Sequence, residues 1–380
     1  MPDEKEDIVK IVIVGACGAV GRWVAADLAS CAEVNDLVLS DVDVDRTKAL
    51  AEQIAGGDRT TVIDGRDQGS LRRALAGADL LMNCASFLMA EEILELAIDA
   101  QVDYVDLMSS PSDDARARAA AAGIVAVTGV GTSPGMTNVL IRHAADEFDA
   151  LEEVHISFAI SRPHLAASKG GLDTVLWELG RHCPERVYFA DGALRPAGPR
   201  EGSRTIDFGE RAGVRDVFYV PHPETASISR NFPSLRFCAV RGTWHPQVMA
   251  EIAVLNKYGL LDADTHEQTK DVLWEKLGTA LDPTMPHYWG LNVEILASAS
   301  GDTVKRVYEI IYDREAWPEQ PVTRGTAVAA AVCGQLVARN ASSSGHAGVL
   351  DPECFFDPEE FLATLRERGT LDARWSDTVL

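Results

Sequence analysis

The sequence predicts an α/β protein that begins with a doubly wound parallel sheet and continues into an α+β domain. Three observations support this. Short β-branched runs alternate with Ala- and Leu-rich segments up to about residue 131, and three glycines follow the first run. After Thr132 this pattern of residues changes. Strands that alternate with helices are typical of βαβ units in a parallel sheet.

The first part of the chain contains six strand-like runs. They are Ile8–Val14, Leu37–Ser40, Thr61–Ile63, Leu80–Asn83, Tyr104–Asp106 and Ile124–Val130. The segments between them that suit helices include Trp23–Ser30, Arg46–Ala55, Glu91–Ala100 and Ala115–Ala122. Six strands with intervening helices predict the Rossmann-type order of a nucleotide-binding sheet.

The second part alternates helical and strand-like stretches. Expected helices are Met136–Phe148, Thr323–Val337 and Pro358–Arg368, and expected strands include His155–Ser161 and Val187–Ala190. Gly301-Asp302 separates two further strand-like runs and predicts a hairpin. Residues 195–215 indicate exposed hairpin loops. We therefore expect a dinucleotide-binding domain at 1–135, an inserted substrate and dimerisation domain at 136–320, and a helical segment at 321–380 that returns to the first domain.

Composition narrows the classes of partner. The 380 residues carry a formal charge of -23, which disfavours nucleic acid and anionic membranes and favours small-molecule ligands. The start of the chain is acidic and no window has the ~20 apolar residues of a membrane helix, so a cytoplasmic protein is expected. The seven scattered cysteines and the nine histidines lack metal-site spacing, so no metal is expected.

The three glycines predict a dinucleotide site. Gly15, Gly18 and Gly21 follow a buried strand and precede a helix, where such folds bind pyrophosphate. The cofactor-binding loop also includes Cys17, Ala19 and Val20. Asp41 ends the second strand, and a carboxylate there accepts hydrogen bonds from both ribose hydroxyls of NAD. NAD is therefore favoured, and NADP stays open because Arg46 lies nearby to meet a 2′-phosphate.

Further candidates follow the carboxyl ends of other strands, where doubly wound folds bind their ligands. For the cofactor these are Asp64, Asn83, Cys84, Ala85 and Ser86. Asp106 is a catalytic candidate, because a carboxylate there attracts a cationic amine or orients the cofactor. Each of these residues is also a common turn residue.

A specific motif follows the sixth strand. Gly129-Val-Gly-Thr-Ser-Pro-Gly-Met-Thr-Asn138 resembles the G-x-x-P-G-x-x-N signature of the saccharopine dehydrogenase family. Further similarities, in the same order along the chain, are Tyr104-Val-Asp106, Ser229-Arg-Asn-Phe-Pro233, Arg241-Gly-Thr-Trp-His245, Tyr258-Gly-Leu-Leu261 and Gly348-Val-Leu-Asp-Pro-Glu353. Within this family the plan is most similar to that of the lysine epsilon-dehydrogenases. The resemblance places Pro134 in the cofactor site and implies a homodimer.

The resemblance implies an enzyme, an NAD-dependent oxidoreductase acting on the carbon–nitrogen bond of an amine or amino acid through an imine. Such oxidation needs a base, since an aliphatic ammonium has a pKa of ~10.4. His245 is the first candidate, with a helix-capping role as its alternative, and His164 and Lys169 are further candidates. Arg230, Arg241 and Arg162 are candidates to bind a substrate carboxylate. The chain has Ile160-Ser-Arg-Pro163 where relatives carry Gly-Gly-x-Pro, so the substrate is not fixed.

Two other functions remain open. A transferase of the homospermidine-synthase type uses bound NAD without net redox change, and a dinucleotide sensor performs no chemistry. Product analysis separates the transferase from the dehydrogenase, because the transferase accumulates no NADH.

Overall fold

The structure is a computed structural model that describes residues 9–54, 59–85, 89–108, 110–165, 168–277, 287–318 and 320–380. The described chain divides into two compact units. The first unit holds residues up to 139 together with 323–368, and the second holds 140–322 together with 369–380.

The first unit is built on a seven-stranded parallel sheet. Its strands are β1 (Val9–Val14), β2 (Val34–Asp41), β3 (Thr60–Asp64), β4 (Leu80–Asn83), β5 (Asp103–Asp106), β6 (Val125–Thr128) and β15 (Gly348–Leu350). Their order across the sheet is β15-β6-β5-β4-β1-β2-β3. β2 and β3 lie on one side of β1, and β4, β5 and β6 lie on the other, so the order of the strands reverses between β1 and β4. In such sheets ligands bind beyond the carboxyl ends of the strands at this point. The predicted Rossmann-type sheet is thus confirmed, and β15 adds a strand that was not predicted.

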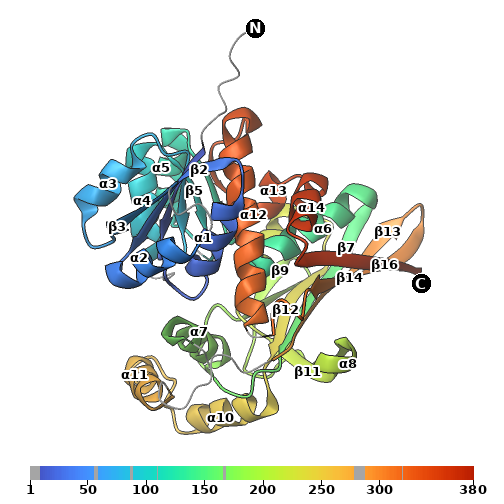
Figure 1. The fold of residues 1–380 in the computed structure, drawn as a ribbon. Coiled ribbons are helices and arrows are strands. Elements are labelled where there is room, and N and C mark those ends of the chain that lie inside the picture. The colour runs from blue at the N-terminus through green and yellow to red at the C-terminus, as the bar shows by residue number, and fades with distance from the viewer. Residues whose placement is uncertain are drawn as a thin grey trace. The chain divides into compact units, whose positions relative to one another are not determined.

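Helices cover both faces of this sheet (Figure 1). They are α1 (Gly21–Ser30), α2 (Val44–Gln53), α3 (Gln68–Leu75), α4 (Ala90–Ala100), α5 (Asp113–Ala122), α12 (Pro321–Ser344), α13 (Pro352–Phe355) and α14 (Pro358–Glu367). Strand residues pointing to either face, such as Ile11 and Val12, have no exposed surface. Continuous apolar strands are expected where helices cover both faces of a parallel sheet.

Ionic contacts tie the last helices to the start of the sheet. Arg368 Nε lies 3.1 Å from Asp27 of α1, and Arg339 pairs with Glu33 at 2.6 Å. Gln335 of α12 also donates to Glu33 at 2.9 Å. These contacts hold α12 and the end of α14 against α1 and the start of β2.

The second unit contains a nine-stranded sheet. Its strands are β7 (Ala150–Ile160), β8 (Val187–Ala190), β9 (Ala193–Pro196), β10 (Arg204–Asp207), β11 (Val214–Tyr219), β12 (Phe237–Thr243), β13 (Trp289–Ala299), β14 (Asp302–Tyr312) and β16 (Leu371–Val379). The main order is β10-β11-β12-β7-β13-β14-β16, and β8 joins β12 to β9. β7 and β12 run parallel, and the other described pairs are antiparallel.

The predicted hairpin is present between β13 and β14. Its two turn residues, Ser300 and Gly301, both have positive φ, as a two-residue turn matched to strand twist requires. Two features differ from the prediction. In the region predicted as hairpin loops, β10 and β11 form paired strands on either side of the short helix at 209–212. The tail ends in β16, which pairs with β14 along nine residues. The sequence did not predict this strand, because charged residues such as Arg374 and Asp377 leave no regular alternation of apolar and polar side chains.

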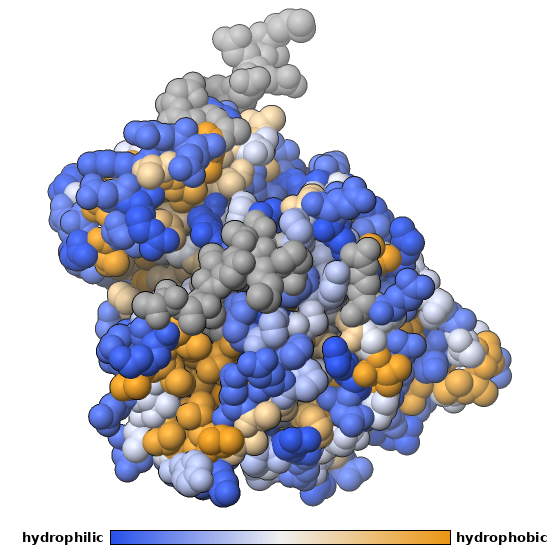
Figure 2. All heavy atoms as spheres, turned by 60° about the horizontal axis from the view of Figure 1, so that its bottom comes forward, coloured by the Kyte–Doolittle hydropathy of each residue, from blue (hydrophilic) through white to orange (hydrophobic). Residues whose placement is uncertain are grey.

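The helices of the second unit are α6 (Thr137–Glu147), which begins in the first unit, α7 (Lys169–Leu179), α8 (Gly209–Ala212), α9 (Glu224–Asn231), α10 (Pro246–Lys257) and α11 (His266–Leu277). Val254, Tyr258 and Leu260 at the end of α10, and Val272 of α11, are exposed. Figure 2 shows apolar surface among charged side chains on the face that contains these helices. No described helix has the length and apolar character to cross a membrane.

Candidate active site

The glycine loop links β1 to α1 at the point where the sheet reverses. Gly15 has a φ of +78°, and its N–H donates to the carbonyl of Ser40 at 2.9 Å. A Cβ on Gly15 would lie 2.6 Å from the nitrogen of Ala85, and a Cβ on Gly21 would collide with the carbonyl oxygen of Gly15. These two positions therefore require glycine.

The amino end of α1 fits an anionic ligand. Its N-cap residue, Val20, forms no side-chain hydrogen bond, so no side chain caps the amide groups there. A Cβ on Gly18 would lie 3.0 Å from the carbonyl oxygen of Gly15, so glycine at this position keeps the loop narrow. Backbone amides at an uncapped helix start bind pyrophosphate even on a negatively charged protein. The loop thus fits a dinucleotide.

Asp41 lies directly beside this loop. Its carboxylate accepts hydrogen bonds from the N–H groups of Cys17 at 3.0 Å and Asp43 at 3.2 Å. Arg46 donates to the carbonyl of Cys17 at 3.2 Å and stays largely exposed. Val42, Asp43, Val44, Asp45 and Arg66 line a surface hollow next to the end of β2. Asp41, which was predicted to bind the ribose, and Arg46, which was considered for NADP, therefore both lie beside Cys17.

The residues after β4 and β5 form one buried network. Asn83 accepts from Ala85 N–H at 2.9 Å and donates to the Tyr104 hydroxyl at 3.0 Å. That hydroxyl donates to Asp106 at 3.2 Å, and Gly129 N–H donates to the other oxygen of Asp106 at 3.3 Å. Burial, then Asp106, raises the pKa of Tyr104 well above its ordinary value. Asp106 is 2% exposed and orients the strand ends in this geometry.

Other predicted cofactor residues lie around this network. Asp64 ends β3 opposite Asp41 and accepts from Arg66 N–H at 2.9 Å. Cys17 and Cys84 are buried free thiols. Ser86 lies outside the described residues.

The signature motif forms a tight turn rather than a set of exposed groups. Gly135 N–H donates to the side-chain oxygen of Asn138 at 3.0 Å, and the Asn138 amide donates to Glu353 at 2.8 Å. Pro134 is buried, next to Gly129. Asn138 thus fixes the turn, and its partner Glu353 comes from the resembling segment near the C-terminus.

In the second unit, the parallel strands β7 and β12 end side by side. Their register pairs Thr243 with Ala159, so Trp244 and His245 follow β12 where Ser161 and Arg162 follow β7. Two predicted substrate or catalytic residues, Arg162 and His245, therefore come from adjacent strand ends.

Arg162 is a desolvated cation. It donates to the carbonyl oxygens of His164 at 3.1 Å and Leu165 at 2.9 Å. Burial lowers its pKa to about 10. Within the described part of the chain no carboxylate forms an ion pair with Arg162, so those residues leave its charge uncompensated.

His245 begins α10 as its N-cap residue and is half-buried. Its Nδ1 accepts a hydrogen bond from Gln247 N–H at 3.2 Å, so the ring hydrogen resides on Nε2 in this arrangement. A neutral imidazole with Nε2–H donates and does not accept at that atom. The geometry shows the capping role that the sequence left as an alternative.

The other arginine candidates lie elsewhere. Arg241 is 3% exposed and donates to the Gly202 carbonyl at 2.8 Å and the Tyr219 hydroxyl at 3.3 Å, with its guanidinium over the Tyr219 ring. These contacts hold the loop before β10 against the sheet. Arg230 is exposed at the end of α9. Lys169, a further candidate, pairs with Asp271 at 2.8 Å.

Sequence reasoning missed a buried ionic cluster of Glu178, His222 and Glu224. His222 Nε2 lies 3.3 Å from Glu178 Oε1, and Nδ1 lies 3.3 Å from Glu224 Oε2. Burial alone would lower the pKa of His222, but Glu224 and Glu178 raise it to about 10. The three residues come from separate elements, and only the short His-Pro-Glu spacing at 222–224 hinted at the pair.

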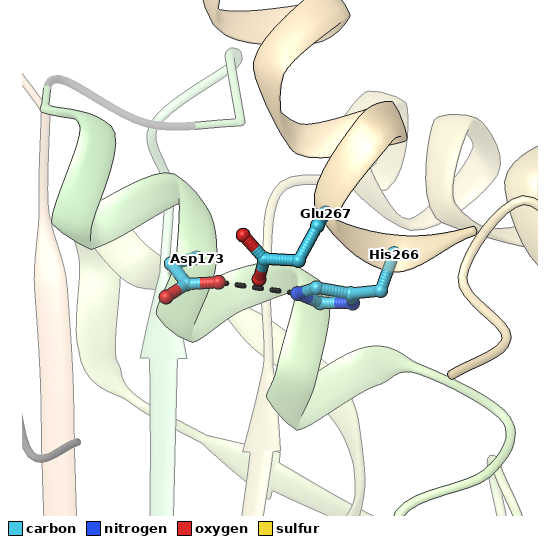
Figure 3. Close-up of side chains that lie close together, drawn as sticks. All are labelled: Asp173, His266 and Glu267. Carbon is cyan, nitrogen blue, oxygen red and sulfur yellow. Dashed lines mark hydrogen bonds and ion pairs between the residues drawn. The ribbon is translucent and has the colours of Figure 1, made fainter. Parts of the chain in front are cut away.

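One group of potential metal ligands joins α7 to α11. Figure 3 shows Asp173 facing His266, with Glu267 beside them. Lys270 Nζ lies 3.3 Å from Asp173 Oδ1 and 2.8 Å from Glu267 Oε2. The ammonium thus supplies the positive charge that these carboxylates need, which favours an ion-pair link between the helices over a metal site.

Comparison with known proteins agrees with both units. The model of the saccharopine dehydrogenase NADP binding domain matches residues 11–130, and the model of the saccharopine dehydrogenase C-terminal domain matches residues 131–370. The chain belongs to the saccharopine dehydrogenase family. The motif at 129–138 spans the boundary between the two matches, and the motif at 241–245 lies within the C-terminal match.

Two known proteins resemble nearly the whole chain. Carboxyaminopropylagmatine dehydrogenase of Synechocystis is 25% identical over 393 residues, covering 95% of this chain and 96% of the relative. The saccharopine dehydrogenase (L-Glu forming) of Saccharomyces cerevisiae has a similar structure, with a TM-score of 0.71, 13% identity and coverage of 98% and 100%.

The homospermidine synthase of Legionella pneumophila, solved with NAD, is also similar in fold, with a TM-score of 0.61, 13% identity and coverage of 97% and 91%. The chain is an enzyme of the saccharopine dehydrogenase type, an oxidoreductase that binds a nicotinamide dinucleotide and acts on carbon–nitrogen bonds.

Proposed function

We propose that the enzyme catalyses NAD-dependent oxidation of an amine that carries a carboxylate, or the reduction of the corresponding imine. The observation that supports this most is Arg162, a desolvated guanidinium without a carboxylate partner among the described residues. A planar guanidinium binds carboxylates through paired hydrogen bonds. The name of the Synechocystis relative, carboxyaminopropylagmatine dehydrogenase, combines a carboxyl group with amines in the same way.

A nicotinamide dinucleotide bound at the glycine loop would supply the acceptor for the hydride that leaves the amine-bearing carbon. The glycine loop, Asp41 and the amino end of α1 bind the dinucleotide, and Arg162 orients the substrate through its carboxylate. The amine must lose a proton before oxidation, since its pKa is ~10.4 in water. Asp106 helps to order the strand ends beside the cofactor loop.

We further propose that His245 acts on the substrate as a hydrogen-bond donor through Nε2–H, rather than as the general base. A lost hydrogen bond of this kind costs about 0.5–1.5 kcal/mol, so His245→Asn should lower kcat/KM by roughly 2- to 12-fold. Asn retains an N-cap acceptor, which keeps α10 intact. The pH profile of kcat/KM should keep its shape. Disappearance of its acidic limb in this variant would instead make His245 the base.

Asp41 is proposed to select NAD over NADP. Asp41→Ser removes the ribose acceptor and the charge that repels a 2′-phosphate, with Arg46 close by. We expect the ratio of kcat/KM for NAD+ to that for NADP+ to fall at least tenfold, since hydrogen bonds to charged groups contribute about 1.5–3 kcal/mol. Asp45→Ser on the same edge is the control and should keep the wild-type ratio. An unchanged ratio in Asp41→Ser would remove this residue from cofactor selection.

The proposal includes a homodimer. It is supported by apolar side chains that are exposed in and after α10 and in α11, namely Val254, Leu260 and Val272, since exposed apolar groups favour association. Light scattering that gave the mass of one chain at micromolar concentration would refute it.

A substrate screen tests the proposed function. Diamines, basic amino acids and secondary amines that carry a carboxylate are each incubated with NAD+ and with NADP+, while absorbance of the reduced cofactor is followed. We expect reduction with carboxylated amines and NAD+. The proposal fails if no amine reduces either cofactor and no amine–carbonyl pair consumes NADH.

A further inference from the structure

The amino end of α12 lies at the same edge of the first sheet as the amino end of α1. Arg324 of α12 lies against Trp23 of α1, and further along both helices the Cys31 thiol donates to Gln335 at 3.8 Å. The two helices therefore run side by side in the same direction (Figure 1). α1 follows the carboxyl end of β1, so both amino ends point to the edge where ligands bind. Backbone N–H groups and helix dipoles favour negative charge there.

The start of α12 also reaches the turn after β6. A Cβ on Gly131 would lie 3.0 Å from Thr326 Cγ2, so the backbone of this turn packs closely on α12. The helix then passes over β4, since a Cβ on Gly334 would lie 3.2 Å from the sulfur of Met82. The start of α12 thus contacts both α1 and the turn after β6, and β4 and β5 lie between β1 and β6 in the sheet.

This part of the sheet edge is the place for the nicotinamide half of a dinucleotide. Asp41, the ribose-binding candidate, ends β2 on one side of β1, and β6 lies three strands from β1 on the other side. Neighbouring strands lie about 4.8 Å apart, so β6 is roughly 14 Å from β1. Dinucleotides bind across the point where the strand order reverses, with the diphosphate at the first helix. A cofactor with its adenosine at β2 therefore extends its nicotinamide towards β4, β5 and β6.

Two buried donors at this edge have no hydrogen-bond partner among the described residues. They are the indole Nε1 of Trp23 and the hydroxyl of Thr132, the residue after Gly131. Thr132 is 2% exposed. Buried polar groups are usually hydrogen-bonded, so two unsatisfied groups at a ligand edge indicate a polar ligand. An indole N–H only donates, which suits a phosphate oxygen, whereas a hydroxyl donates and accepts, which suits a carboxamide.

Arginine side chains place positive charge beside the indole. The guanidinium carbon of Arg324 lies 4.0 Å from the centre of the Trp23 ring, and that of Arg22 lies 5.2 Å from it. Guanidinium groups stack favourably on indole rings, so these contacts orient the ring and hold the charge next to the glycine loop. Guanidinium groups also bind phosphate oxygens through charge-assisted hydrogen bonds. The same place therefore suits a diphosphate.

We propose that Trp23, Arg324 and Thr132 form the nicotinamide-side half of the dinucleotide site. Trp23 Nε1–H and the Arg324 guanidinium bind the diphosphate, and the Thr132 hydroxyl binds the carboxamide of the nicotinamide. α12 thus completes a site that begins at the glycine loop. This inference rests on dinucleotide binding, which is the cofactor part of the proposed function, and not on the identity of the amine.

Calorimetric binding of two ligands tests the proposal. NADH carries both the diphosphate and the carboxamide, whereas ADP-ribose carries the diphosphate alone. Trp23→Phe keeps an aromatic ring for Arg324 to stack on and removes the N–H, and Thr132→Val keeps the shape of the side chain and removes the hydroxyl. Trp375→Phe and Thr378→Val, at exposed positions on β16, are the matched controls. Thermal unfolding of each ligand-free variant is measured on the same preparations.

The two ligands should distinguish the two donors. Trp23→Phe should weaken NADH and ADP-ribose alike, by about tenfold or more, because each loses a hydrogen bond to a charged group. Thr132→Val should weaken NADH by roughly 2- to 12-fold and leave ADP-ribose unchanged. Neither variant should lower the unfolding temperature, since each removes an unsatisfied buried group. Arg324→Gln should weaken both ligands, with a smaller effect at high salt. Both controls should bind as the wild type does.

Wild-type binding constants for both ligands in Trp23→Phe and Thr132→Val would overturn this half-site, while the glycine loop and the proposed oxidation would stand. Equal weakening of both ligands by Thr132→Val, together with a lower unfolding temperature, would make Thr132 a structural residue of its turn and would overturn its assignment. If neither of these variants folds, the affinity of Arg324→Gln for ADP-ribose at low salt decides the question. A wild type that bound neither NADH nor NADPH would contradict the dinucleotide site as a whole.

Discussion

Gly21→Ala is expected to weaken NADH binding by at least a hundredfold. The added Cβ would collide with the carbonyl oxygen of Gly15, so either the glycine turn or the start of α1 must shift. Both parts supply the backbone amides that fit the pyrophosphate, and close backbone approach is the reason for glycine at such a turn. Fluorescence titration with NADH measures the effect.

Gly170→Ala is the matched control for this variant. A Cβ at Gly170 meets no atom within 4 Å, and the residue lies inside α7, where Ala is the better helix former. It should leave NADH affinity unchanged. A dissociation constant for Gly21→Ala within threefold of the wild type would show that the loop does not hold the cofactor as described.

Arg162→Leu is expected to lower the activity of the enzyme without lowering its stability. Loss of one partner of a desolvated charge pair costs about 2–5 kcal/mol, so kcat/KM for a carboxylated amine should fall by roughly 30-fold or more. Stability should stay equal or rise, because the change removes a half-buried charge that has no carboxylate partner among the described residues. Steady-state kinetics and thermal unfolding, run on the same preparations, measure both effects.

Two comparisons support the interpretation of that experiment. Arg236→Leu removes an exposed arginine that pairs with Glu152 and should change neither property. An amine of the same length without the carboxylate should lose much less activity in Arg162→Leu than the carboxylated amine does. A uniform loss on both amines, with a lower unfolding temperature, would make Arg162 a structural residue of its loop.

Local sequence patterns were sufficient to predict the parallel sheet. Its strands are apolar runs, and turn or capping residues separate them from the helices, so period and composition locate them. β15 escaped prediction because three residues, Gly348–Leu350, are too few to form a pattern. β16 escaped because an edge strand with charged residues on both faces has no clear alternation, and its identity depends on pairing with β14.

The sequence predicted residues of the candidate site only where they lie in elements that are close together along the chain. The glycine loop and Asp41 follow from strand order and spacing, and the geometry places them together. The sequence could not show that Arg241 is engaged by Gly202 and Tyr219, or that His222 lies between Glu178 and Glu224, because these partners come from distant elements. His245 illustrates the same limit, since only the position of Gln247 N–H shows which ring nitrogen accepts a hydrogen bond.

The most direct test of carbon–nitrogen oxidation is the stoichiometry of a single reaction. The enzyme is incubated with a carboxylated amine and excess NAD+, and NADH and the carbonyl product released by imine hydrolysis are both quantified. We expect one NADH for each carbonyl product. Amine product that forms without NADH, as a transferase with recycled NAD would give, would contradict the proposed dehydrogenase.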